Sequence, residues 1–85
     1  MEMIETIEIK EKIRKFIAET AFVPEEKIQD GTMIFTEGIF DSMGFLSLIN
    51  FIEDNFDVKA EDAELLEENF ESLEAISAFV VRKTN

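Results

Sequence analysis

The chain contains no cysteine, histidine or tryptophan among its 85 residues. Without cysteine it forms no disulfide, which fits a reducing compartment, and we expect a cytoplasmic protein. Histidine and cysteine ligands are missing, and the spaced Asp/Asn pattern of a calcium loop is absent, so we expect no metal site. A serine hydrolase needs a base to take the hydroxyl proton, usually histidine. We therefore expect no enzyme activity from this chain alone.

Long apolar runs are also missing. No stretch approaches the length of a membrane span, and the N-terminus lacks the apolar block of a signal peptide, so we expect no membrane insertion. The length predicts a single domain over residues 1–85. A domain of this size buries roughly 60% of its unfolded surface, which leaves no room for a deep enclosed active site.

Acidic residues dominate the charge. The chain has 20 Asp and Glu against 8 Lys and Arg, a net charge of −12, and Lys59 is the only base between Asp41 and Glu74. This field repels nucleic acid and anionic lipid and attracts basic partners to the second half. The alternative is that acidity serves only solubility. Nine Phe and 46% hydrophobic residues distinguish the chain from a disordered acidic tail.

Apolar spacing predicts three longer helices, over about residues 4–19, 42–56 and 73–83. The first rests on Ile9, Ile13, Phe16 and Ile17. Ser72 suits the start of the last helix, and the acidic stretch 60–69 predicts a short helix or turn. No convincing strand alternation occurs. We therefore predict an all-α fold, a small antiparallel four-helix bundle with three longer helices and one short helix.

A long connection joins the first two predicted helices, beginning with a turn at Pro24. About 20 residues without regular structure are unusual in a compact domain and often indicate function. The apolar residues of this loop predict that it packs against the bundle. They are Ile28, Met33, Ile34, Phe35, Ile39 and Phe40.

Ser42 follows this loop and begins the second predicted helix. Asp41 or Ser42 is a good N-cap for that helix. The free amides and the dipole of a helix N-terminus favour a negatively charged group, so a phosphate ester on the Ser42 oxygen is electrostatically favourable. The alternative is that the Asp-Ser pair is only a helix cap.

The second predicted helix has two apolar-containing stripes. A core stripe comprises Phe45, Leu48, Ile49, Ile52 and Phe56. The adjoining stripe, which we call the partner face, mixes apolar and polar side chains and suits a transient partner. It comprises Met43, Leu46, Ser47, Asn50, Glu53 and Asp54. The alternative is an ordinary solvated flank.

The run Gly38-Ile39-Phe40-Asp41-Ser42-Met43-Gly44 and the helix after it resemble the attachment motif and second helix of acyl carrier proteins. The resemblance extends over nearly the whole chain. It implies that Ser42 carries 4′-phosphopantetheine, transferred from coenzyme A by a phosphopantetheinyl transferase. The prosthetic thiol then holds the cargo as a thioester. Asp41 matches the acid before the attachment serine and helps the transferase place its Mg²⁺.

The resemblance also implies that the partner face meets basic patches on acyl ligases or synthases, through weak and charge-steered docking. We expect a monomer. Fatty-acid carriers usually have acids where this chain has Gly44 and Ser47, and this departure points away from general fatty-acid synthesis to a dedicated, specialised carrier. The pathway expected from the resemblance is fatty-acid or related specialised acyl and polyketide biosynthesis. A glycine at the start of this helix also predicts local mobility, since it costs about 1 kcal/mol of helix stability.

Three further questions stay open at this point. An aminoacyl carrier of the D-alanyl or peptidyl type is one alternative function, and an acidic interaction module without cargo is another. Phe45, Ile49, Ile76 and the loop residues either line a cleft for an acyl chain or form a filled core.

Overall fold

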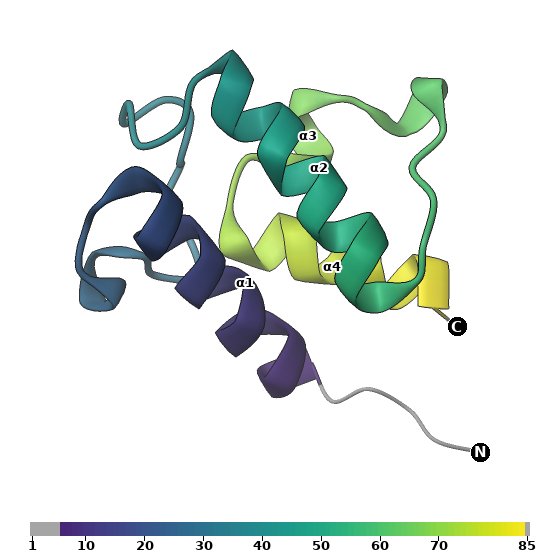
Figure 1. Cartoon of the computed structure of the whole chain (residues 1–85), viewed down its shortest axis with the longest axis horizontal. Coiled ribbons are helices and arrows are strands. Elements are labelled where there is room, and N and C mark those ends of the chain that lie inside the picture. Colours follow the sequence, from purple (N-terminus) through teal and green to yellow (C-terminus); the bar gives the residue numbers. More distant parts are fainter. Residues whose placement is uncertain (1–5, 85) are drawn as a thin grey trace.

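The computed structural model describes residues 6–84 of the chain (Figure 1). This range contains four α-helices and two short 3-10 turns, joined by loops. No strand occurs in this range, so the predicted all-α bundle of three longer helices and one short helix is confirmed. Positions 4 and 5 of the first predicted helix lie outside the described residues. The elements are α1 (Thr6–Ala21), η1 (Glu25–Lys27), α2 (Ser42–Phe56), η2 (Asp62–Glu64), α3 (Glu67–Phe70) and α4 (Leu73–Thr84).

Helix α1 buries one apolar face against α4 and α2. Ile9, Ile13 and Ile17 are fully buried, as their spacing predicts. The helix ends where Phe22 takes a left-handed conformation with φ of 60°, and the Val23 amide donates to the Ala18 carbonyl at 3.0 Å. This is the Schellman pattern of helix termination.

Helix α2 has the predicted bounds and buries the core stripe. Leu48, Ile52 and Phe56 are buried, while Phe45 and Ile49 pack against the core from its edge. The helix stops at Asp57, whose φ of 53° is left-handed. None of the helices in residues 6–84 has the length and apolarity needed to cross a bilayer.

The connection between α1 and α2 is packed onto the bundle, as predicted. Ile28, Ile34 and Phe40 are buried. The Ile34 amide donates to the Glu71 carbonyl at 2.9 Å, which ties the loop to the segment before α4. Lys10 donates to the Asp30 carboxylate at 2.9 Å, and this hydrogen bond holds the Asp30 pKa below its ordinary value. The loop therefore holds the chain in place as it enters α2.

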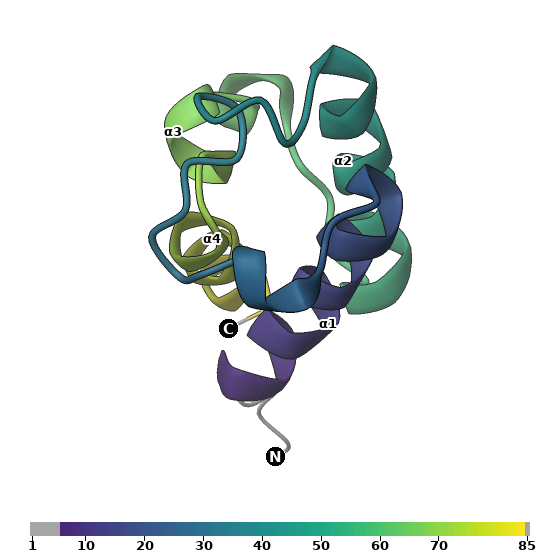
Figure 2. The same ribbon diagram turned by 90° about the vertical axis from the view of Figure 1, so that its left-hand side faces the viewer.

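The last third of the chain closes the core. The Ser72 hydroxyl accepts a hydrogen bond from the Ala75 amide at 3.2 Å, so Ser72 caps α4 as predicted. Phe70 and Phe79 are buried with their ring centroids 4.9 Å apart. Seen from the side in Figure 2, α3 and α4 lie opposite α1 and α2 around this core.

Candidate functional site

Ser42 is the first residue of α2 and is exposed to solvent. The helix cap is its neighbour Asp41, whose carboxylate accepts a hydrogen bond from the Gly44 amide at 3.0 Å. The sequence left open which of the two residues is the cap, and the structure assigns this role to Asp41. Within residues 6–84, no side chain or backbone group is hydrogen-bonded to the Ser42 hydroxyl. Ser42 therefore presents a free hydroxyl at the positive end of a helix dipole.

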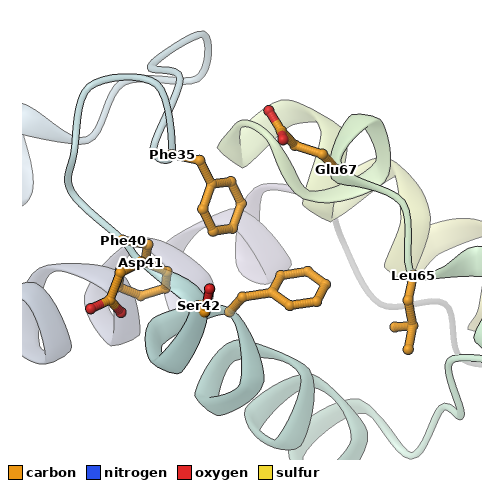
Figure 3. Close-up of a pocket in the computed structure, with 7 residues that line it drawn as sticks. Phe35, Phe40, Asp41, Ser42, Leu65 and Glu67 are labelled. Atoms are coloured by element: carbon orange, nitrogen blue, oxygen red, sulfur yellow. The ribbon is translucent and has the colours of Figure 1, made fainter.

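A hollow of about 380 Å³ opens directly beside Ser42 (Figure 3). Its walls come from the loop, the start of α2 and the segment entering α3. They comprise Phe35, Phe40, Asp41, Ser42, Phe45, Leu65 and Glu67. Sequence reasoning included the loop phenylalanines and Phe45 but missed Leu65 and Glu67. These two come from a segment more than 20 residues beyond Ser42, and no local pattern indicates that it folds back.

Aromatic rings close the inner end of this hollow. The Phe45 ring packs edge-on to Phe35 at 5.8 Å and to Phe70 at 5.4 Å between centroids. Ile76 was considered for the lining of a cleft, but it is fully buried in the core. Ile49 is half-buried against the core and does not line the hollow. Of the residues considered for a cleft, Phe35, Phe40 and Phe45 therefore line the hollow, and Ile49 and Ile76 do not.

A second hollow of about 320 Å³ lies on the α1 side of the same helix start. It is lined by Thr20, Ala21, Gly38, Ile39, Phe40, Asp41, Met43, Gly44 and Ser47. Phe40 and Asp41 line both hollows, so they form the wall between them. Gly38 has φ of 78°, a conformation that L side chains rarely adopt, and it turns the chain toward Ser42.

Gly44 allows this wall to form. A Cβ atom placed at Gly44 would lie 2.8 Å from Cγ of Phe40, which is closer than any normal contact. From sequence, the low helix propensity of glycine predicts local mobility at Gly44. In the structure Gly44 is buried, and its lack of a side chain lets the Phe40 ring lie against the helix backbone. A glycine four residues after an aromatic loop residue is the only signal of this contact that the sequence carries.

The partner face predicted on α2 is mostly exposed. Met43 and Leu46 are 70% and 57% exposed, and Ser47, Asn50 and Asp54 also face solvent. Its remaining member, Glu53, is half-buried, and its carboxylate accepts a hydrogen bond from the Ala60 amide at 3.1 Å. Glu53 therefore has a structural contact that the sequence did not indicate.

The four serines of the chain differ sharply in their exposure to solvent. Ser72 is 8% exposed and caps α4, while Ser77 is 1% exposed and donates to the Leu73 carbonyl at 2.9 Å. Ser47 is exposed one turn into α2, and Ser42 is exposed at its first residue.

Among residues 6–84 no cluster of His, Cys, Asp and Glu is arranged to hold a metal ion.

A family model described as the phosphopantetheine attachment site matches residues 11–80. The chain belongs to this family. Phosphopantetheine-attachment domains carry 4′-phosphopantetheine covalently on a serine, are modified by a phosphopantetheinyl transferase and work with synthases or ligases. A search of curated proteins finds no match to this chain.

The residues around α2 fit such a prosthetic group. An attachment serine needs a hydroxyl that is accessible and not already hydrogen-bonded, which excludes Ser72 and Ser77. Ser42 meets this requirement, and the helix N-terminus beside it favours the negative charge of a phosphodiester. The phosphopantetheine-attachment domain thus has a suitable serine between two hollows.

Proposed function

We propose that this protein is an acyl carrier whose 4′-phosphopantetheine group is attached to Ser42. The observation that carries the proposal is the position of this serine. It is exposed at the first residue of α2, its neighbour Asp41 supplies the cap, and its own hydroxyl is free. In the transfer, Ser42 Oγ forms an ester bond to phosphorus, the pyrophosphate bond of coenzyme A breaks, and adenosine 3′,5′-bisphosphate leaves. The hydroxyl proton goes to the transferase, because this chain has no histidine to accept it.

The chain itself positions and presents the cargo. When attached, the prosthetic group supplies the thiol that holds an acyl group as a thioester. Asp41 orders the first turn of α2 around the attachment point. The net charge of −12 attracts basic surfaces on ligases and synthases and favours fast, weak encounters. This behaviour suits a protein that is not an enzyme and serves several enzymes in fatty-acid or related specialised acyl biosynthesis.

An aminoacyl cargo is the second candidate, supported by the neutral start of the partner face. Met43, Leu46, Ser47 and Asn50 are uncharged and exposed, and Gly44 between them is buried. The first acid on α2 is Glu53, about three turns beyond Ser42. Parallel loading assays with fatty acids and with amino acids, each with a matching AMP-forming ligase, separate the two cargo classes.

The deciding experiment is the intact mass of the protein after incubation with coenzyme A and a broad-specificity phosphopantetheinyl transferase. We expect the wild type and Ser47→Ala to gain one phosphopantetheinyl group, and Ser42→Ala to gain none. Ser47→Ala is the matched control, since Ser47 is the other exposed serine of the chain. A wild type that gains no mass would leave an acidic interaction module as the better interpretation.

A further inference from the structure

Phe22 occupies a position that neither the local backbone nor the core explains. It ends α1 in the left-handed conformation, with φ of 60°. Glycine is the usual residue there, because a Cβ atom is disfavoured in this conformation. The Phe22 side chain is 92% exposed, so it gains almost none of the stabilisation that burial of an aromatic ring provides. The residue therefore has a conformational cost and no compensating contact within the fold.

Phe22 lies next to the hollow on the α1 side of the attachment point. Helices α1 and α2 pack against each other, on the same side of the molecule in Figure 2. The hollow is lined by residues from the end of α1 and from the first turns of α2. Ala21, immediately before Phe22, lines it from α1, and Met43 lines it from α2. Met43 is 70% exposed and directly follows Ser42. One exposed apolar side chain, Met43, thus lines this hollow beside the attachment serine, and a second, Phe22, directly follows a residue that lines it.

Asp41 lines this hollow, and Glu19 and Glu37 each directly precede a residue that lines it. The first turns of α2 are uncharged. Lys27 is the only base between Lys15 and Lys59. Apart from Asp30, which is half-buried and bonded to Lys10, the acids of the α1 end, the loop and the helix cap are exposed. They are Glu19, Glu25, Glu26, Glu37 and Asp41. The negative potential near Ser42 therefore comes from the α1 side, and the complementary partner surface is an apolar recess flanked by Lys and Arg.

We propose that Phe22, Met43 and the hollow lined by Ala21 and Met43 form a docking surface for the phosphopantetheinyl transferase. This inference rests on the proposed attachment at Ser42. Before modification the carrier has no prosthetic arm, so the transferase must hold the protein surface within bonding distance of Ser42. Enzymes that act on the thioester can reach it at the far end of the arm. The transferase is therefore the partner that most needs contacts immediately around Ser42.

The test compares steady-state transfer by a broad-specificity phosphopantetheinyl transferase on wild type, Phe22→Gly and Ile7→Ala. Phe22→Gly should raise KM about tenfold and leave kcat unchanged, as loss of a docking contact does. Its melting temperature should not fall, because glycine relieves the left-handed strain. Ile7→Ala is the matched control, since Ile7 is 73% exposed near the opposite end of α1. It should leave both constants unchanged.

Each outcome decides a different claim. If the wild type is modified and the KM of Phe22→Gly lies within about twofold of the wild-type value, the proposed docking surface is wrong. The proposed attachment at Ser42 is not affected by that result. An equal rise in Ile7→Ala would also overturn the inference, because it would show a general effect of surface apolarity. If the wild type gains no group, the proposed function itself fails.

Discussion

The lack of a side chain at Gly44 shapes the region around Ser42. Its missing Cβ lets Phe40 lie against α2, and Phe40 separates the two hollows. In an isolated helix, glycine is less favourable than alanine by about 1 kcal/mol. The contact with Phe40 reverses that preference, because an added methyl group has no space.

Gly44→Ala is therefore expected to destabilise the protein by about 1–2 kcal/mol, since overpacking outweighs the gain in helix propensity. Urea unfolding followed by circular dichroism measures the change. Gly31→Ala is the matched control, because a Cβ at Gly31 meets nothing within 4 Å. A Gly44→Ala protein as stable as wild type would show that Phe40 moves aside without cost.

Asp41 and Ser42 have different roles: Asp41 caps α2, and Ser42 presents the exposed hydroxyl. Asp41→Ala removes the cap on the Gly44 amide and should lower the unfolding free energy by about 1 kcal/mol. Ser42→Ala should change it by less than about 0.5 kcal/mol, because its hydroxyl is exposed and is not the cap. Equal losses in the two variants, measured by urea unfolding, would contradict this division.

At the scale of elements, Glu53 links the end of α2 to the segment that leads to η2. Its carboxylate accepts from the Ala60 amide at 3.1 Å. Glu53→Ala should cost about 1 kcal/mol and speed hydrogen exchange at the Ala60 amide, since the bond is charge-assisted but partly exposed. Asp54→Ala, on the exposed neighbour, should do neither. Unchanged protection of Ala60 in Glu53→Ala would show that the contact does not hold this segment.

Glu64 links η2 to α4. The Glu61 amide and, secondly, the Lys83 ammonium at 2.9 Å hold the pKa of Glu64 below its ordinary value of 4.5. A lowered carboxyl pKa contributes stability above the unfolded value, and this contribution is lost as pH falls through the folded value. The melting-temperature deficit of Glu64→Gln should be full at neutral pH and shrink below pH 4.5. A deficit that is independent of pH would exclude this ionic contribution.

At the scale of the whole molecule, the net charge of −12 resides on a body of 36 × 27 × 20 Å. Most of these charges repel one another, and the few surface ion pairs, such as Lys10 with Asp30, contribute little. Salt shortens the Debye length from about 30 Å at 0.01 M to 3 Å at 1 M. Calorimetry in rising NaCl should therefore show a rising melting temperature. A fall would mean that the ion pairs outweigh the repulsion.

Sequence alone determined the features that depend on residues within a few turns of each other. The bounds of α2, the buried stripe through Leu48 and Ile52, and the cap of α4 at Ser72 all follow from apolar spacing and capping chemistry. The exposed serine at the start of α2 and the family to which the chain belongs could be predicted for the same reason. Both are properties of a continuous run of residues.

Tertiary structure decided what depends on segments that meet only after folding. The hollow beside Ser42 needs Leu65 and Glu67 from far along the chain. The close contact of Gly44 with Phe40 and the structural use of Glu53 depend on distances that periodicity does not encode. A one-dimensional pattern states which side of a helix is apolar. Only the packed chain decides which atoms approach that side, and how closely.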